Sequence, residues 1–148
     1  YLYCIGNPRT DWCFKTEAQA GLQGRSLSYP RGKVLGGCSS INGMIYMRGQ
    51  ASDYDRWAEQ GNPGWAWKDV LPLFKRSEKH YGGNADMHSS DGEWRVEQQR
   101  YSWPILDAFR AAAAQSGIPT VDDFNTGDAE GVGFAVYQVK SGAFAEVK

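Results

Sequence analysis

The sequence predicts an α+β fold in which amphipathic helices and short strands are separated by turns. Two observations predict the helices: apolar residues recur every three or four positions from Trp67 to Phe74, and a second apolar face runs from Pro104 towards Gly117. A third observation predicts strands, because polar and apolar residues alternate over 93–97. Glycines and prolines, 18 and 6 of the 148 residues, punctuate these segments.

Length and composition restrict the classes of function. The chain has the length of one ordinary domain, and 41% hydrophobic with 22% charged residues is typical of a folded protein. The 16 Lys and Arg nearly balance the 17 Asp and Glu, so no overall field attracts nucleic acid or anionic lipid. No apolar run approaches the roughly 18 residues of a membrane-spanning helix. We therefore expect no nucleic-acid partner and no membrane span.

The cysteines give little information about the setting of the protein. Cys4, Cys13 and Cys38 are an odd number with no C-x-x-C spacing, which argues against a disulfide framework or a zinc site. We expect a reduced, cytoplasmic setting and no metal. The chain begins at Tyr1 with no leader sequence, and we expect it to be a piece of a longer protein.

The first third of the chain combines turns with one glycine-rich segment. Residues 1–31 carry scattered glycines, prolines and aromatic residues, which predicts a connection of turns and short extended pieces. Residues 32–40 are small and glycine-rich, and 41–47 are mostly apolar. This order predicts a tight loop that opens a helix, with Ser39 or Ser40 as its cap.

Two helices are expected next. Residues 52–55 have the S-x-x-D form of a capping box, which predicts a short helix that ends at the turn 61–64. The next helix presents Trp67, Val70, Leu71 and Phe74 on one face and runs to about Lys79. Pro72 lies inside that pattern, where it kinks the helix or marks a late start.

The remaining elements alternate between strand and helix. Residues 81–92 are polar and predict an exposed loop, 93–97 predict a strand, and 131–139 predict another strand. Between the strands, Ser102 is the expected cap of a helix with Pro104 in its first turn. The apolar face of that helix consists of Ile105, Leu106, Phe109, Ala112 and Ala113. Residues 141–148 show no clear pattern.

The segment of the sequence that most strongly indicates ligand binding is the glycine-rich one. Its paired glycines, Gly36 and Gly37, let the backbone approach a planar or phosphorylated ligand, and Asn42 offers both a donor and an acceptor. A Gly-Gly turn before a helix is also common as plain packing. Physical reasoning alone therefore leaves both interpretations open.

The order of residues around this segment resembles the N-terminal signature of the glucose-methanol-choline (GMC) oxidoreductases, flavin enzymes that oxidise alcohols. Similar features extend over about residues 6–139 and point to the choline-dehydrogenase-like branch of the family. They are Asn7-Pro8 and Trp12 upstream, and 46–49, 53–57, 64–67, 71–78, the loop around His88 and 122–125 downstream.

The resemblance implies a set of flavin contacts. In this family the glycine-rich segment lines FAD, so the implied cofactor-binding residues are Val34, Gly36, Gly37, Asn42, Gly43, Met44 and Ile45. In the choline oxidase branch a histidine bonds covalently to the flavin, and its position is occupied here by Ile41, which has no nucleophile. We therefore expect non-covalent FAD.

Three departures from the family pattern limit what this chain contributes. The G-x-G-x-x-G fingerprint that holds the ADP half of FAD is absent, and Gly131 and Gly133 lack the third glycine. The histidine that accepts the substrate proton in the family lies beyond this segment, so we name no catalytic residue. Residues 140–148 depart from the family pattern. The implied fold is a GMC-type FAD-binding segment without the first Rossmann βαβ unit and the C-terminal catalytic part.

The domain assignment follows from this fold. The resemblance implies that residues 1–148 are a partial N-terminal FAD-binding domain and that 93–139 lead into the region of the substrate domain.

Other side chains with possible chemistry have plainer interpretations. His80 and His88 lie in polar surroundings without a Cys, Asp or Glu at metal spacing, and we expect them at the surface. The six tryptophans could form a sugar-stacking platform, although their spacing favours packing anchors at helix ends.

The expected function is a segment of an FAD-dependent oxidoreductase that oxidises an alcohol to an aldehyde or ketone by hydride transfer to flavin. Its expected partners are a small-molecule alcohol and the remainder of the enzyme chain or a complementary subunit. We expect the isolated chain to be inactive. Two alternatives remain: a non-catalytic remnant or subunit that needs a partner chain, and a tryptophan-rich carbohydrate-binding module.

Overall fold

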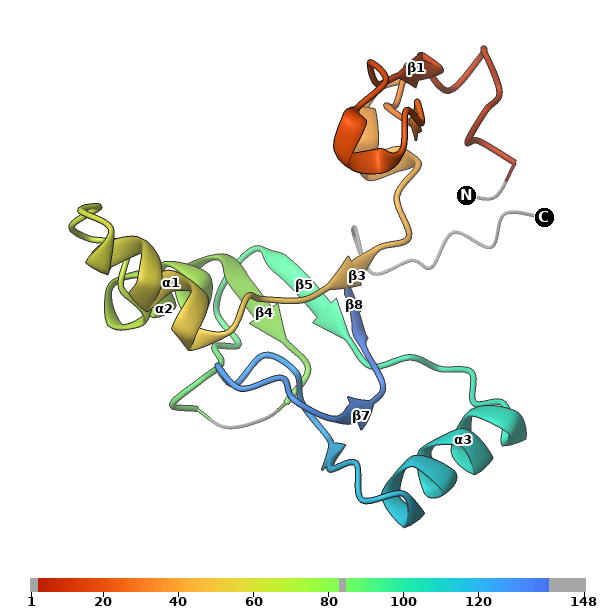
Figure 1. Ribbon diagram of the computed structural model, residues 1–148. Helices are drawn as coiled ribbons and strands as arrows, with labels where there is room; N and C mark the ends of the chain where they lie inside the picture. The colour runs from red at the N-terminus through yellow and green to blue at the C-terminus, as the bar shows by residue number, and fades with distance from the viewer. Residues whose placement is uncertain (1–2, 83–84, 139–148) are drawn as a thin grey trace. The chain divides into compact units, whose positions relative to one another are not determined.

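The computed structural model describes residues 3–82 and 85–138 (Figure 1). The chain divides into two compact units, Tyr1–Met44 and Ile45–Lys148, and each is described by itself. Both short strands and helices are present, so the α+β prediction is confirmed.

The first unit is built around a β-hairpin. Strand β1 (Phe14–Lys15) pairs antiparallel with β2 (Ser28–Tyr29), and an isolated bridge between Asp11 and Gly32 continues the pairing. The 3-10 helix η1 (Ala20–Leu22) lies in the hairpin loop. The expected mixture of turns and short extended pieces is confirmed. The antiparallel pairing of the extended pieces was not predicted from the sequence.

A buried carboxylate holds the base of this hairpin. Asp11 is 2% exposed and accepts hydrogen bonds from the backbone N–H groups of Gly6 (2.8 Å), Cys13 (2.9 Å) and Arg31 (2.9 Å). These hydrogen bonds, with that from Gly6 the strongest, lower the pKa of Asp11. One side chain therefore ties together three turns of the first unit.

The helix predicted after the glycine-rich loop does not form. Only the 3-10 helix η2 (Gly37–Ser40) is present, and the chain turns at Ile41 before it reaches strand β3 (Ile45–Tyr46). Met44 has a left-handed φ of 60°, which an α-helix cannot contain. The two predicted caps also act differently, since the hydroxyls of Ser39 and Ser40 donate to the preceding carbonyls of Gly36 and Leu35.

The second unit contains a four-stranded sheet in the order β3-β8-β5-β4. Strands β4 (Glu78–His80) and β5 (Trp94–Glu97) are parallel, whereas β8 (Val136–Gln138) is antiparallel to both β5 and β3. Strand β5 confirms the alternation that predicted it, because Val96 is completely buried while Trp94 is half-exposed. Val96, Val136 and Val70 form part of the apolar core.

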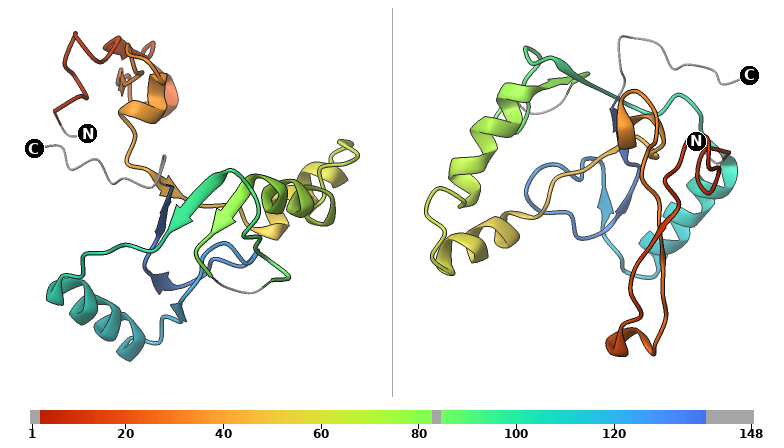
Figure 2. Two further views of the ribbon diagram at one scale, coloured as in Figure 1. Left: turned by 180° about the vertical axis from the view of Figure 1, so that it is seen from behind. Right: turned by 90° about the horizontal axis from the view of Figure 1, so that it is seen from above.

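Two helices precede β4 and lie side by side at one end of this unit (Figures 1 and 2). Helix α1 (Ala51–Glu59) begins one residue before Ser52, and the N–H of Gln50 donates to the Asp53 carboxylate, so the capping residues differ from the predicted ones. Asp55 instead accepts from the N–H of Trp67, the first residue of α2 (Trp67–Ser77). Pro72 lies inside α2 without ending it.

Helix α3 (Pro104–Gln115) lies at the other end of the unit, beside β6 (Thr120–Val121) and β7 (Val132–Gly133) (Figure 2). Pro104 is its first residue, as predicted, but Trp103 takes the capping position instead of Ser102. Most of the predicted apolar face is exposed in this chain: Ile105 and Phe109 are 68% and 65% exposed, and Ala113 is the member of that face that is buried.

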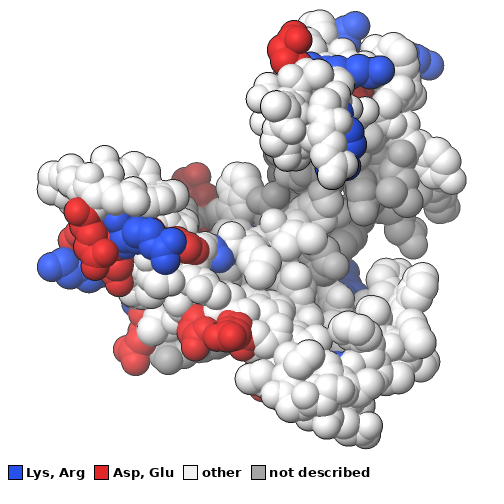
Figure 3. All heavy atoms as spheres, in the orientation of Figure 1, with Lys and Arg blue, Asp and Glu red and all other residues white. Residues whose placement is uncertain are grey.

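The last predicted strand is interrupted. Strands β7 and β8 flank a break at Phe134 and Ala135, and Val139 lies outside the described residues together with 140–148. In the part of the chain that the structure describes, no helix has both the length and the apolar character that crossing a bilayer requires. On the face shown in Figure 3, acidic and basic side chains are interspersed over α1 and α2.

Candidate functional site

The glycine-rich turn of the first unit uses two of its glycines for its own packing. A Cβ on Gly32 would collide with the carbonyl of Gly37, and a Cβ on Gly36 would lie 2.6 Å from the hydroxyl of Ser40. Gly36 also has a left-handed φ of 88°, which favours glycine. The turn is therefore closed on one side by its own backbone.

The other side of the same turn is open. A Cβ on Gly37 or Gly43 would meet no atom within 4 Å. Apolar side chains are exposed beside these glycines: Leu35 is fully exposed, and Val34 and Met44 are 37% and 36% exposed. An open backbone flanked by exposed apolar groups is a surface that a flat ligand can approach closely.

Asn42 fixes the exit from the turn. Its side-chain oxygen Oδ1 accepts a hydrogen bond of 2.9 Å from the N–H of Met44, which stabilises the left-handed conformation of that residue. The acceptor of Asn42 and the amide of Met44 are thus used within the chain. The side-chain NH₂ group of Asn42 has no acceptor in the described part of the chain and is available to a ligand.

The seven predicted flavin contacts fall within residues 34–45 of the sequence, on both sides of the boundary between the two units. The first unit contains Val34, Gly36, Gly37, Asn42, Gly43 and Met44, and Ile45 is the first residue of β3 in the second unit. Ile41, at the position where a covalent attachment would occur, is only 4% exposed and carries no nucleophile.

A second feature, absent from the sequence predictions, is a buried charge cluster in the second unit. It comprises Tyr46, Arg48, Glu78, His88, Asp123 and Asn125. These residues come from β3 and the segment after it, from β4, and from two loops. They all belong to segments that carry the resemblance described above, but they are far apart along the chain.

Arg48 joins three segments within this cluster. Its Nη2 lies 2.6 Å from Oε2 of Glu78, and both side chains are almost completely buried. Its Nη1 donates to the carbonyls of Met87 (2.8 Å) and Asn125 (3.1 Å). Its backbone N–H donates to Oδ1 of Asn125 at 2.8 Å. The guanidinium also lies over the ring of Phe74, 5.3 Å from the centroid.

Glu78 is the central acceptor of the cluster. Besides Arg48, its Oε2 accepts from the hydroxyl of Tyr46 (3.1 Å), while Oε1 contacts Nδ1 of His88 (3.0 Å) and accepts from the N–H of Ser89 (3.0 Å). Burial alone would raise the pKa of Glu78, but the hydrogen bonds from His88 and Arg48 outweigh it and lower the pKa to about 2. The carboxylate is therefore charged and fully partnered.

Both histidines are buried, which corrects the expectation that they lie at the surface. His88 and His80 are 5% and 6% exposed, and their rings stack with centroids 3.8 Å apart. Burial disfavours the charged form of His88, yet its hydrogen bonds to Asp123 (2.7 Å) and Glu78 raise its pKa to about 9. Burial lowers the pKa of His80, and the charge of His88 acts in the same direction. His88 is thus the charged partner and His80 the neutral one.

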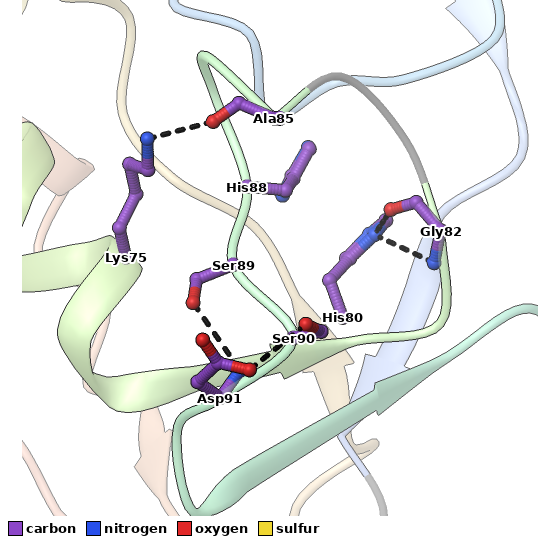
Figure 4. Close-up of a pocket in the computed structure, with 8 residues that line it drawn as sticks. All are labelled: Lys75, His80, Gly82, Ala85, His88, Ser89, Ser90 and Asp91. Atoms are coloured by element: carbon purple, nitrogen blue, oxygen red, sulfur yellow. Dashed lines mark hydrogen bonds between the residues drawn. The ribbon is translucent and has the colours of Figure 1, made fainter.

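A pocket of about 410 Å³ lies beside the stacked histidines (Figure 4). Lys75 of α2 borders it, and its Nζ donates to the carbonyl of Ala85 at 2.7 Å. Nε2 of His80 is buried and has no hydrogen-bond partner in the described residues. The lining residues are Lys75, His80, Gly82, Ala85, His88, Ser89, Ser90 and Asp91.

The cluster holds segments together through its ion pairs and hydrogen bonds, while Nε and Nη2 of Arg48 have no hydrogen-bond partner among the described residues. The described residues contain no group of three or more His, Cys, Asp and Glu side chains arranged to bind a metal. Sequence reasoning missed the cluster because its members are separated by long stretches, although a charged residue directly after an apolar strand, as at Arg48, is a signal that could have drawn attention to it.

A comparison with protein families decides the identity of the fold. The model of the GMC oxidoreductase family matches residues 13–146, which is most of the chain. The chain belongs to the GMC oxidoreductase family. An oxygen-dependent choline dehydrogenase of Rhizobium etli (strain CIAT 652) is 43% identical over 134 residues, which are 90% of this chain and 24% of that protein.

Two solved structures are similar in fold to this chain. Pyridoxine 4-oxidase from Mesorbium loti matches with a TM-score of 0.84 and 32% identity, over 95% of this chain and 28% of that one. An FAD-dependent oxidoreductase from Chaetomium thermophilum matches with a TM-score of 0.78 and 30% identity, over 86% and 24%. The chain thus spans about a quarter of the length of these relatives and carries a segment of their fold.

Proposed function

We propose that this chain is the flavin-covering segment of an FAD-dependent GMC oxidoreductase that oxidises an alcohol to an aldehyde or ketone. The observation that carries the proposal is the open side of the glycine-rich turn, within a segment that the GMC family model matches. The names of the relatives support both parts of it, since one acts on choline and another is called FAD-dependent. Residues 93–139 lead, on this proposal, into the substrate domain.

The residues of the turn fit a flavin. Gly37 and Gly43 leave room for a planar ring system, and Val34 and Met44 provide apolar contacts beside it. The NH₂ group of Asn42 can donate to a flavin oxygen. Gly36 would shape the turn through its left-handed φ, and Ile45, the first residue of β3, would complete the set of seven proposed contacts.

This chain contributes positioning to the reaction. When bound, FAD would accept the hydride that leaves the alcohol carbon. The turn would hold the cofactor and exclude water from one side of it, and the donor on Asn42 would fix its orientation. Since Ile41 is buried and lacks a nucleophile, attachment would be non-covalent.

We expect the isolated chain to bind FAD weakly and to show no turnover. Large apolar side chains such as Ile105, Phe109 and Leu35 are exposed in it. Each large side chain that stays in water forgoes about 1.5–3 kcal/mol of burial, and a few of them equal the roughly 5–15 kcal/mol by which whole domains are stable. The remainder of an enzyme chain or a complementary subunit would cover these faces.

A hybrid protein tests this proposal. In it, residues 13–146 of this chain replace the corresponding segment of the Rhizobium etli choline dehydrogenase, and the unmodified relative is the control. We expect the hybrid to purify with the visible absorbance of oxidised flavin, to release that flavin on denaturation, and to oxidise an alcohol. A hybrid that folds like the relative but remains colourless would contradict the proposal.

A further inference from the structure

Strand β3 has little backbone support of its own. It is an edge strand of the four-stranded sheet, and its ladder to β8 consists of two residue pairs, Ile45 with Tyr137 and Tyr46 with Val136. Such a short edge ladder does not by itself fix the position of a strand. Something else must hold β3 in place.

Along β3 and the two residues after it, side chains alternate between an exposed side and a buried side. Ile45 and Met47 are 57% and 55% exposed, whereas Tyr46 is half-buried and Arg48 is 5% exposed. This alternation is that of an extended segment with one inner and one outer side. The inner residues belong to the buried charge cluster, and the outer residues are apolar.

Both inner side chains end on the same carboxylate. The Tyr46 hydroxyl and the Arg48 guanidinium contact Oε2 of Glu78 at 3.1 and 2.6 Å. Glu78 belongs to β4, the opposite edge strand of the sheet. The backbone N–H of Arg48 is in turn held by Asn125. The contacts therefore bind one edge strand to the other and to a loop, independently of the backbone ladder.

Stability alone does not explain such a group. Taking charges out of water costs several kcal/mol per ion, and an apolar group of similar volume often serves stability equally well. A hydrogen-bonded ionic group differs in being directional, since it accepts one arrangement of its partners. Glu78 accepts hydrogen bonds from Tyr46 and Ser89, contacts His88, and forms a close ion pair with Arg48, so its position specifies where Tyr46 and Arg48 lie.

We propose that Glu78 is a positioning residue that fixes β3 through Tyr46 and Arg48, and so holds Ile45 at the place from which it contacts the flavin. The last part of this inference rests on the proposed function. The first part concerns the chain alone and can be tested without a cofactor. If Glu78 positions β3, substitutions in the cluster should increase amide exchange mainly in β3 and the residues after it. If the cluster only stabilises the core, the increase should be the same throughout the sheet.

Amide hydrogen exchange of the 148-residue chain tests the first part. Tyr46→Phe removes one hydrogen bond to Glu78 and should raise exchange over 45–49 about threefold, and Glu78→Gln should raise it about tenfold. In Tyr46→Phe, exchange over 94–97 should stay unchanged; in Glu78→Gln, exchange over 45–49 should rise more than exchange over 94–97, which follows the loss of global stability. Glu97→Gln is the matched control, because it makes the same charge change in the same sheet at a partly exposed ion pair with Arg95.

Three results would overturn the inference: no protection of 45–49 in the unchanged chain, no increase in either variant, or an equal increase over 45–49 and 94–97. Tyr46→Phe keeps the test valid if Glu78→Gln unfolds the chain, since it deletes a single oxygen.

The hybrid protein tests the second part. There, Tyr46→Phe and Glu78→Gln should shift the visible spectrum of the bound flavin or lower its occupancy at least about threefold, while Glu97→Gln should not. Unchanged spectrum and occupancy in both variants would overturn the link to the flavin. If the unchanged hybrid binds no flavin, the proposed function fails, and the exchange experiment still decides whether Glu78 positions β3.

Discussion

The carboxylate of Glu78 and the guanidinium of Arg48 lie 2.6 Å apart, and both are shielded from solvent. Removing Glu78 leaves the buried charge of Arg48 without an anionic partner among the described residues, and removing Arg48 leaves Glu78 with His88 as its one cationic partner. We therefore expect Arg48→Met to lower the free energy of unfolding by about 3 kcal/mol. Urea denaturation of the single variants Arg48→Met and Glu78→Gln and of the double variant measures the coupling.

The loss in that double variant should be smaller than the sum of the single losses by at least about 1 kcal/mol. Strictly additive losses would show that the ion pair contributes nothing of its own.

Stability should depend on pH through the same cluster. Folding raises the pKa of His88 from 6.5 to about 9, so its contribution is complete below pH 6.5 and is lost as the pH rises to about 9. Folding lowers the pKa of Glu78 from 4.5 to about 2, so its contribution is present above pH 4.5 and is lost as the pH falls towards 2. The urea concentration at the unfolding midpoint should therefore decrease as the pH rises from 6.5 to about 9, the range over which His88 loses its proton.

His88→Gln is the variant that checks the alkaline limb. It should lower stability at pH 6 and remove most of the decline between pH 6.5 and 9. An alkaline decline of full size in His88→Gln would assign the effect to another group.

The first unit should depend on Asp11 for its closure. Asp11→Ala leaves three backbone N–H groups without their acceptor and should loosen the base of the hairpin. Asp11→Asn keeps an oxygen in place and should loosen it less. The measurement is the rate of limited proteolysis within 12–32, which should rise most for Asp11→Ala. Equal rates in the two variants and the unchanged chain would rule out this role.

The exposed face of α3 should respond to its surroundings. In the isolated chain, Phe109→Ser should change the free energy of unfolding by less than about 0.5 kcal/mol, because the ring is largely in water. Val96→Ala, at a fully buried position, should cost about 2 kcal/mol in the same chain. In the hybrid protein Phe109→Ser should become clearly destabilising. Thermal unfolding of both proteins gives the comparison, and a neutral Phe109→Ser in the hybrid would mean that nothing covers α3.

The sequence correctly predicted the helices and strands that depend on the pattern of neighbouring residues. The spacing of Trp67, Val70 and Phe74 identified α2, alternation identified β5, and Pro104 marked the start of α3. The apolar run 41–47 misled because its conformation depends on one side chain, Asn42, which accepts from the N–H of Met44 and turns the backbone out of the helical region.

The buried charge cluster was beyond reach of the sequence for a different reason. Arg48, Glu78, His88 and Asp123 come from separate segments, and each looks like an ordinary surface residue among its own neighbours. Their pairing exists only after β3, β4 and two loops have assembled. The exposure of the α3 face could not be predicted for a similar reason. The periodicity of the sequence shows that the face is apolar, but it does not show which part of the protein covers that face.

Flavin occupancy of two glycine variants of the hybrid protein tests the central claim most directly. Gly43 and Gly21 both have open space at the Cβ position and lack a left-handed φ, so the chain accommodates Gly43→Leu and Gly21→Leu equally well. If the open side of the turn lies against the flavin, Gly43→Leu should lose most of the bound flavin, and Gly21→Leu should retain it. Equal occupancy in the two variants would contradict the account.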